Sequence, residues 1–350
     1  MTTDARAAAP GAGAGAPRTA DVGLSIVVPL YNEAGGLAAL HARICEVARR
    51  LRETRGLSCE VVYVDDGSRD NTLALAATLP ASGLDVQVVS LSRNFGKEAA
   101  LLAGLDHARL GAVLFMDGDG QHPPSLVETL VRHWLDDGYD VSYTAKLDRE
   151  SESWVMRAGT KVFYTVINWG SHHKIPADAG DFRLLSPRAV TALRQLPERN
   201  RFFKGLASWI GFRQIRVDYR PEERLHGRTS WNLYRLVGLS IEGLTSFSVA
   251  PLRLASLLGL LLAGSALVFG AMILFEVLFQ GVAVPGYPSV VVGLMVLGGV
   301  QLVMIGIMGE YIGKILSELK GRPAYFVAEH VVKTADSGQA VTPPARTAAE

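Results

Sequence analysis

Two aspartates separated by one residue have the spacing of a metal-binding pair. Asp117 and Asp119 follow an apolar run that ends at Met116, and Gln121 stands two positions further along. Carboxylate and amide oxygens placed in this way can face one hard cation, and Mg²⁺ or Mn²⁺ takes such ligands when it bridges substrate phosphates. We therefore expect Asp117 and Asp119 to bind Mg²⁺ or Mn²⁺, with Gln121 as a further oxygen ligand or as a residue that orients a bound water. The cation would stabilise charge on a departing diphosphate.

A second acidic turn follows an earlier apolar run. Asp65 and Asp66 come directly after residues 60–64 and precede Gly67 and Ser68. An acid placed immediately after a buried strand costs free energy unless a partner uses it. A uracil imide or a ribose hydroxyl would be such a partner, so Asp66 is a candidate for binding a nucleoside.

The elements around these turns predict that both lie at one rim of a sheet. Short β-branched runs alternate four times with helix-like stretches, which indicates an α/β domain with a largely parallel sheet. In open sheets of this kind, ligands bind beyond the carboxyl ends of the strands. The third run ends in residues 92–97, where Arg93 and Lys97 add positive charge to an otherwise acidic rim. The runs cover residues 25–30, 60–64, 86–91 and 112–116, and the helix-like stretches cover 35–52, 71–79, 98–109 and 125–136.

The last third of the chain is apolar enough to enter a membrane. Residues 254–275 and 277–309 carry no charge, and each stretch exceeds the roughly 20 residues that span a bilayer. We predict a two-helix anchor within residues 251–320, with helices at about 254–278 and 288–312. Basic residues flank the outer ends of the pair, so the positive-inside rule places both termini and the large domain in the cytoplasm.

The segments around the anchor have their own expected roles. Residues 231–250 place apolar side chains at helical spacing beside a basic stretch, which suits an interfacial amphipathic helix or, alternatively, a packed domain helix. Residues 1–22 are rich in Ala, Gly, Pro and Thr and predict a disordered leader. Residues 321–350 predict a cytoplasmic tail that is largely disordered.

The composition argues against some classes of protein. Lys and Arg total 35 and Asp and Glu total 34, so no overall positive field favours nucleic acid. The two cysteines, Cys45 and Cys59, have neither metal-ligand spacing nor the density of a disulfide scaffold, which suits a reducing compartment. No nucleic-acid partner is expected.

Several motifs in order resemble the family 2 glycosyltransferases. The sequence Val-Val-Pro-Leu-Tyr-Asn-Glu at 27–33, the Asp-Asp-Gly-Ser turn at 65–68 and the Asp-Gly-Asp-Gly-Gln turn at 117–121 are similar to that family. Residues 93–98, 180–184 and 246–252 further resemble its bacterial dolichyl-phosphate-mannose-synthase-like branch, and within it the bactoprenol glucosyltransferases. The likeness runs from Leu24 to about Arg322. It implies a GT-A fold over residues 23–230, a Rossmann-like mixed, mostly parallel sheet flanked by helices, followed by two transmembrane helices.

The resemblance also implies roles for individual residues. Asp181 matches an acid considered for catalysis or for orienting the sugar, and Asp119 joins it as a catalytic candidate; Arg183 belongs to the same motif as Asp181. Because an acceptor phosphate monoester is largely ionised at neutral pH, orientation is the first role expected of Asp181 and a base role the second. The residues expected to bind the nucleotide are Pro29, Tyr31, Glu33, Asp66, Asp117 and Arg93.

Basic residues are expected to hold the phosphates. Arginine suits phosphate oxygens, which makes Arg157 the first candidate for the acceptor phosphate, followed by Lys146 and Arg149. Each of these could instead be a solvated surface charge. Residues 224–231 resemble a family loop that closes over the diphosphate through Arg224 and Arg228, although Ser230 stands where many relatives have lysine.

The expected reaction is inverting transfer of a sugar from a nucleotide diphosphate sugar, with UDP-glucose favoured, to undecaprenyl phosphate or another polyprenyl phosphate. The product would be β-linked, and the enzyme would lie in the inner (plasma) membrane as a multi-pass protein. A homo-oligomer formed through the transmembrane helices is compatible with this arrangement. Transfer of mannose or N-acetylglucosamine is the alternative. A processive synthase predicts a Gln-x-x-Arg-Trp signature that the sequence lacks, and a non-catalytic sugar-lipid scaffold would not need the Asp-x-Asp pair.

Overall fold

The four predicted strand–helix alternations form the centre of one sheet. The computed structural model describes residues 23–146, 179–198, 203–220, 250–280, 286–335 and 340–341. Strands pair in the order β4-β1-β2-β3, and all three pairings are parallel. These strands are β1 (Leu24–Leu30), β2 (Cys59–Asp65), β3 (Asp85–Leu91) and β4 (Ala112–Phe115), and the helices that follow them are α1 (Leu37–Arg55), α2 (Thr72–Thr78), α3 (Lys97–His107) and α4 (Pro124–Leu135).

Helices cover both faces of this parallel centre. In β1, Ile26 and Val28 face the core shared with α1 and α4, whereas Val27 faces the core shared with α3. This explains why the strands read as nearly continuous apolar runs. Helix α3 approaches the sheet closely, because a Cβ added at Gly104 would lie 2.1 Å from a methyl carbon of Val27.

Antiparallel pairings extend the sheet on both sides. Strand β6 (Ala179–Leu185) runs antiparallel to β4 and to β5 (Val141–Lys146), and β7 (Gln214–Tyr219) pairs parallel to β5. Helices α6 (Pro187–Arg194) and α7 (Phe203–Trp209) pack on the face that α3 covers. The sheet is therefore mixed, as predicted, but its unbroken parallel run is confined to the central four strands.

The tail contributes a strand that the sequence did not predict. Residues Val327–Lys333 form β8, which pairs antiparallel with β3, and Ala340–Val341 form β9 beside it. His330 Nε2 lies 2.8 Å from Gln87 Oε1 of β3, and Lys333 Nζ donates to the backbone oxygen of Leu79, which follows α2, at 2.8 Å. The expectation of a largely disordered tail is wrong for 327–333, because the partner that orders the strand is far away in the sequence.

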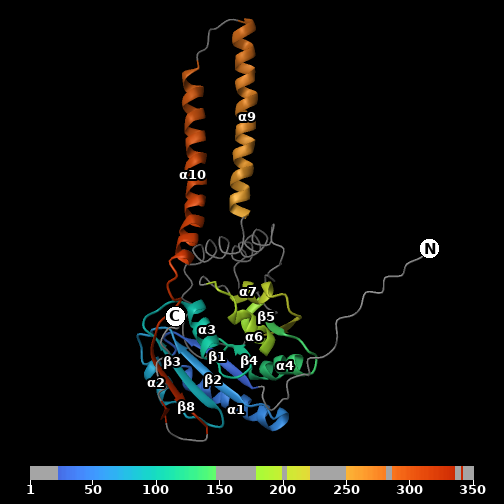
Figure 1. Ribbon diagram of the computed structural model, residues 1–350, viewed down its shortest axis with the longest axis vertical. Coiled ribbons are helices and arrows are strands. Elements are labelled where there is room, and N and C mark those ends of the chain that lie inside the picture. Colours follow the sequence, from blue (N-terminus) through green and yellow to red (C-terminus); the bar gives the residue numbers. More distant parts are fainter. Residues whose placement is uncertain are drawn as a thin grey trace, which may run out of the picture.

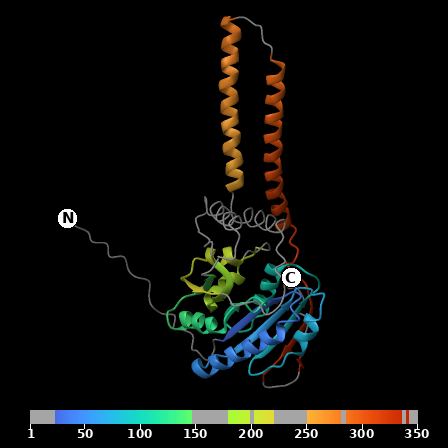
Figure 2. The same cartoon turned by 180° about the vertical axis from the view of Figure 1, so that it is seen from behind.

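Two long helices follow the sheet domain. Figures 1 and 2 show α9 (Ala250–Gln280) and α10 (Tyr287–Leu319) side by side, extending away from the sheet. Apolar side chains on both are exposed, including Leu260 at 71% and Leu302 at 71%. Within the described residues, the stretch Val296–Leu319 is the one found long and apolar enough to cross a membrane, so a two-span anchor stays a prediction. The predicted leader, and residues 231–249 of the predicted interfacial helix, lie outside the described residues.

Candidate active site

Asp117 and Asp181 lie together at the rim where the central strands end. In the β4–β6 pair Phe115 stands opposite Arg183, and the same antiparallel register continued by two residues brings Asp117 opposite Asp181. Lys97, the first residue of α3, bridges the two acids. Its Nζ lies 2.5 Å from Asp117 Oδ1 and 2.6 Å from Asp181 Oδ2. Asp117 of the predicted metal motif and Asp181 of a distant motif therefore share one ammonium group, that of Lys97.

A second lysine completes this lysine–aspartate cluster. Lys204 lies on α7, and its Nζ is 3.1 Å from Asp181 Oδ1, so each carboxylate oxygen of Asp181 has a lysine partner. The side chains of Lys97, Asp117, Asp181 and Lys204 are 43%, 29%, 24% and 23% exposed. Helix α7 lies on the side of the sheet domain that faces α9 and α10 (Figures 1 and 2). The cluster is open enough to exchange partners with a ligand.

The charges in the cluster stabilise one another. Burial raises the pKa of Asp181, but the ammonium groups of Lys204 and Lys97 outweigh burial and hold that pKa well below its usual range. Burial likewise raises the pKa of Asp117, and Lys97 together with His122 more than reverses this. Burial lowers the pKa of Lys97, whereas the two carboxylates raise it by more. Lys97 and both aspartates are therefore ionised at neutral pH.

Glu98 and Arg183 connect the cluster to the start of α7. Glu98 accepts a hydrogen bond from the backbone N of Phe203 at 2.9 Å, and burial raises its pKa to about 7 despite that bond. Arg183 is 3% exposed and donates to the backbone oxygens of Gly180 at 2.9 Å and Phe203 at 3.4 Å. Both side chains thus help to position the helix that carries Lys204.

The turn with the predicted metal ligands is held against α1 and β1. The backbone N of Gln121 donates to Asp119 Oδ1 at 3.1 Å, and Arg43 of α1 donates to Gly120 O at 3.1 Å. Gly120 has a φ of +72°, which favours glycine. A Cβ added at Gly118 would lie 3.1 Å from a backbone oxygen of β1. The glycines between the polar residues therefore allow a tight turn in close contact with the sheet.

The residues of this turn fit a hard divalent cation. Asp117, Asp119 and Gln121 offer oxygen ligands, and the ammonium beside Asp117 demonstrates that this carboxylate attracts a cation. Within the described ranges no group of three or more His, Cys, Asp or Glu side chains gathers as a metal cage. Mg²⁺ is commonly held by one or two carboxylates together with waters and substrate phosphates.

The carboxylate of Asp66 is hydrogen-bonded to the backbone of a neighbouring loop. Its carboxylate accepts hydrogen bonds from the backbone N of Phe95 at 2.7 Å and of Gly96 at 3.0 Å. Burial raises the pKa of Asp66, and these two bonds only partly offset that effect. A Cβ added at Gly67, whose φ is +66°, would lie 2.6 Å from Asn94 N, so the two loops touch. Asp66 thus holds the β3–α3 loop, and its contact with a nucleoside stays a prediction.

The other predicted nucleotide residues lie at the same rim. Pro29 lies in β1, and Tyr31 and Glu33 follow the end of that strand. Tyr31 is 42% exposed and so is accessible to a ligand. Arg93 follows β3, with its guanidinium 4.2 Å from the ring centroid of Phe95. The fold brings these residues near the ends of neighbouring strands, as the sequence predicts.

Most of the predicted phosphate-binding residues lie outside the part of the chain that the structure describes. Arg149, Arg157, Arg224 and Arg228 lie outside the described residues, so their roles stay predictions. Lys146 is the last residue of β5. Because β5 runs antiparallel to β6, which itself runs antiparallel to β4, the ends of β5 and β4 point to the same rim. The backbone of Lys146 therefore stands on the correct side of the sheet for its predicted role.

Three residues of the site received no role from the sequence. Lys97 was recognised only as positive charge at the rim, and Lys204 carries no local signal because tertiary packing alone brings α7 to Asp181. His122 directly follows the metal motif. Its ring stacks on Phe182 with centroids 4.4 Å apart, and its Nε2 lies 3.7 Å from Asp117 Oδ2. Its position directly after the Asp-x-Asp turn is the sequence feature that could have identified His122 as a residue of the site.

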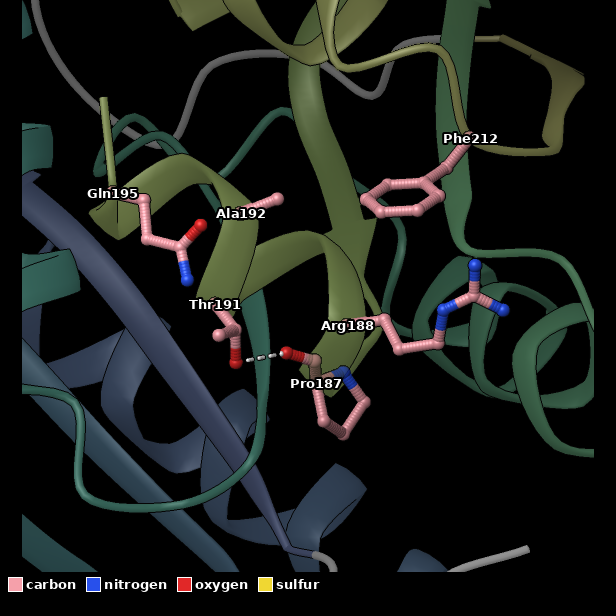
Figure 3. A pocket seen from close by; sticks show the side chains of 6 residues that line it. All are labelled: Pro187, Arg188, Thr191, Ala192, Gln195 and Phe212. Atoms are coloured by element: carbon pink, nitrogen blue, oxygen red, sulfur yellow. Dashed lines mark hydrogen bonds between the residues drawn. The ribbon is translucent and has the colours of Figure 1, made fainter. Parts of the chain in front are cut away.

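A separate hollow lies on α6, away from the rim residues. Figure 3 shows Arg188 and Phe212 on one side of it, where the guanidinium lies 4.8 Å from the ring centroid. Thr191 Oγ1 donates to Pro187 O at 2.8 Å, one turn earlier in the same helix. Among the described residues, those that line this hollow include no carboxylate. Its lining consists of Pro187, Arg188, Thr191, Ala192, Gln195 and Phe212.

A family model and several curated proteins match this chain. The model described as Glycosyl transferase family 2 matches residues 25–193, which run from β1 to α6. An uncharacterized glycosyltransferase of Synechocystis sp. is 42% identical over 306 residues, covering 87% of this chain and 95% of the relative. The bactoprenol glucosyl transferase of Shigella phage SfII is 39% identical over 304 residues, covering 87% and 97%. A prophage bactoprenol glucosyl transferase homolog of Escherichia coli K12 is 38% identical over 304 residues, covering 87% and 98%.

Proposed function

This chain belongs to glycosyl transferase family 2, and from that premise we propose that it transfers glucose from UDP-glucose to undecaprenyl phosphate. The observation that carries the proposal is the convergence of Asp117, Asp181, Lys97 and Lys204 at the carboxyl rim of the sheet. An acidic pair with two lysines offers cation binding and phosphate binding side by side. The lipid acceptor is proposed from the bactoprenol glucosyl transferases that resemble the chain.

The donor side of the proposal uses the ends of β1 to β4. Pro29, Tyr31, Glu33, Asp66 and Arg93 would surround the nucleoside. The Asp66 contacts to the β3–α3 loop support this arrangement, because they hold that loop at the rim before any ligand binds.

The metal side of the proposal uses the turn after β4. Asp117, Asp119 and Gln121 would hold Mg²⁺ or Mn²⁺, which would supply compensation for the negative charge of the diphosphate. The chain's own part is to hold the oxygen ligands in a tight turn, where Lys97 pairs with Asp117.

The acceptor needs no strong base from the chain. A phosphate monoester has a second pKa near 6, so at neutral pH its oxygen is already largely an anionic nucleophile. Asp181 carries two lysine partners and a pKa held low, which makes it a poor proton acceptor and favours an orienting role. The acceptor oxygen would bond to the anomeric carbon as the bond to the diphosphate oxygen breaks, and that electron pair would leave with UDP. Attack from the opposite face inverts the centre and yields a β-linked product.

The lysines and the predicted arginines divide the phosphate contacts. Arg157, Lys146 and Arg149 would hold the acceptor phosphate, and Arg224 with Arg228 would close over the diphosphate. The position of α7 on the side facing α9 and α10 supports entry of a lipid phosphate from that direction (Figure 1). The proposed location is the inner membrane, with α9 and α10 as a two-span anchor and the sheet domain with both termini in the cytoplasm.

The test is transfer of label into lipid by the purified full chain. The assay contains undecaprenyl phosphate, Mg²⁺ or Mn²⁺ and one radiolabelled donor at a time: UDP-glucose, GDP-mannose or UDP-N-acetylglucosamine. We expect label in the lipid phase with UDP-glucose. Transfer only from another donor would replace the glucose assignment, and no transfer from any donor would refute the proposed reaction.

A matched pair of variants tests the metal motif. Asp119→Ala should lower transfer by about 100-fold or more, because the metal-held charge compensation acts in the transition state. Asp137→Ala removes an exposed acid just beyond the far end of α4 and should leave transfer unchanged. Full activity of the Asp119 variant would remove that residue from the site.

A further inference from the structure

Lys97 occupies the position of an internal counter-ion between two carboxylates. Its Nζ pairs with Asp117 at 2.5 Å and with Asp181 at 2.6 Å. Asp117 is at the same time a ligand in the proposed metal site. A lysine ammonium and a divalent cation compete for one carboxylate, because their positive charges repel each other at that distance.

We propose that Lys97 is an exchangeable cation: it neutralises Asp117 in the empty enzyme and leaves for substrate phosphate oxygens when a divalent cation binds. The inference rests on the proposed function, which supplies the metal and the phosphates. It assigns Lys97 a direct contact with the reacting phosphates, a role that no sequence motif gave it.

The surroundings of Lys97 allow this exchange. Its side chain is 43% exposed, the largest exposed fraction among the four members of the cluster, and a four-carbon stem lets its ammonium move while the helix stays in place. When Lys97 leaves, Asp181 keeps the ammonium of Lys204 at 3.1 Å, so that acid is not left without a counter-ion. Asp117 loses its lysine and becomes available as an oxygen ligand.

Substrate phosphates would balance the charge that a bound cation adds at the rim. Two lysines balance two aspartates in the resting cluster, and a divalent cation alone would leave an excess of positive charge there. The phosphates of the donor and acceptor bring the negative charge that the released ammonium can pair with. A lysine suits this task because it binds phosphate as a mobile point charge.

The experiment measures Mn²⁺ binding to the full chain without nucleotide or lipid. Electron paramagnetic resonance of free Mn²⁺ gives the dissociation constant for the wild type, Lys97→Met and Lys204→Met. Removing the competing ammonium in Lys97→Met should tighten Mn²⁺ binding roughly tenfold, since a positive neighbour disfavours a bound cation. Lys204→Met is the matched control, because its ammonium pairs with Asp181 and should change Mn²⁺ affinity by less than about twofold.

Two outcomes overturn the proposal. Unchanged or weaker Mn²⁺ binding in Lys97→Met would show that the ammonium does not compete for Asp117. Equal tightening in both lysine variants would show a general field effect instead of exchange. If Lys97→Met does not fold, as judged by circular dichroism, Lys97→Gln removes the same charge with a polar stem and receives the same test.

A second readout separates this proposal from the proposed reaction. Lys97→Met should bind Mn²⁺ more tightly and yet transfer sugar at least about 10-fold more slowly, because the phosphates lose a charged partner. Wild-type levels of transfer in that variant would refute the phosphate contact. If the wild type transfers sugar from no donor, the reaction is wrong, whereas the Mn²⁺ measurement still decides whether Lys97 competes with a cation.

Discussion

Strand β2 has an acid at each end, and the two ends are built differently. Glu60, near its start, is 1% exposed and accepts hydrogen bonds from Ser25 Oγ at 2.6 Å and Gln87 Nε2 at 2.9 Å. Arg109 donates to it twice, through its backbone N at 2.6 Å and its Nε at 2.9 Å. Neighbouring strands and the segment after α3 therefore saturate this carboxylate with fixed donors.

At the carboxyl rim of the sheet, some polar side-chain atoms within the described residues have no hydrogen-bond partner, and others have a lysine partner that can move. Asp65 Oδ1 and His122 Nδ1 are buried and have no hydrogen-bond partner within the described residues. Asp117 and Asp181 are paired with lysines, whose long stems can move. The difference teaches that burial of an acid does not by itself mark function. Here Glu60 is saturated by fixed donors, whereas Asp117 and Asp181 of the candidate site have lysine partners that can be exchanged.

Glu60→Ala should give the largest effect on stability. It leaves Arg109 and Gln87 without their buried acceptor, which should lower the free energy of unfolding by about 3–5 kcal/mol. Chemical denaturation of the full chain in detergent, followed by tryptophan fluorescence, measures this. Asp85→Ala removes a more exposed partner of Arg109 and should cost less than about 1 kcal/mol. A folded Glu60 variant that lost transfer specifically would contradict the structural role.

Asp181→Asn should instead affect the reaction. The substitution keeps the shape and removes the charge that organises Lys97 and Lys204, so transfer should fall by about 100-fold or more. The free energy of unfolding should fall by about 1–3 kcal/mol, less than for Glu60→Ala, because the two lysines lose a partly buried charged acceptor. Transfer assays and the same denaturation experiment test the two halves. Normal transfer would remove Asp181 from the site.

Asp66→Asn should have an intermediate effect on stability. An amide offers one oxygen and one NH₂ group, so one of the two backbone donors, Phe95 N or Gly96 N, would face another donor. That mismatch should cost about 1–3 kcal/mol. Asp106→Asn is the control, since Asp106 accepts one bond from the Tyr325 hydroxyl and an amide oxygen can do the same. Equal stability of the two variants would show that Asp66 does not hold the loop.

Glu98→Gln should have the smallest effect and should depend on pH. Burial raises the folded pKa of Glu98 to about 7, above its unfolded value. At a pH between these two pKa values, the folded chain holds a proton that the unfolded chain has released. The stability from this group is present below the unfolded pKa and is lost as pH rises through about 7. Relative to wild type, the variant should gain about 1 kcal/mol between pH 6 and pH 8. Melting curves at both pH values test this, and parallel pH profiles would contradict it.

Local sequence was sufficient for the parallel centre of the sheet and for the acidic turns at its rim. The strands are short apolar runs and the turns follow them directly, so periodicity and position predicted both. The strand–helix order also placed Asp66 and Asp117 at one rim, because parallel strands end on the same side. The same reasoning could not say that backbone amides already occupy Asp66, since its partners follow another strand.

Tertiary structure decided the partners of these residues. Asp181 meets Asp117 through an antiparallel pairing between β6 and β4, and Lys204 joins them through the packing of α7. Strand β8 forms because β3 offers an open edge to a segment more than 200 residues later in the chain. The physical reason is common to all three: a local pattern reports which face or rim a residue occupies, whereas an ion pair or a strand pairing depends on a second segment at a distance.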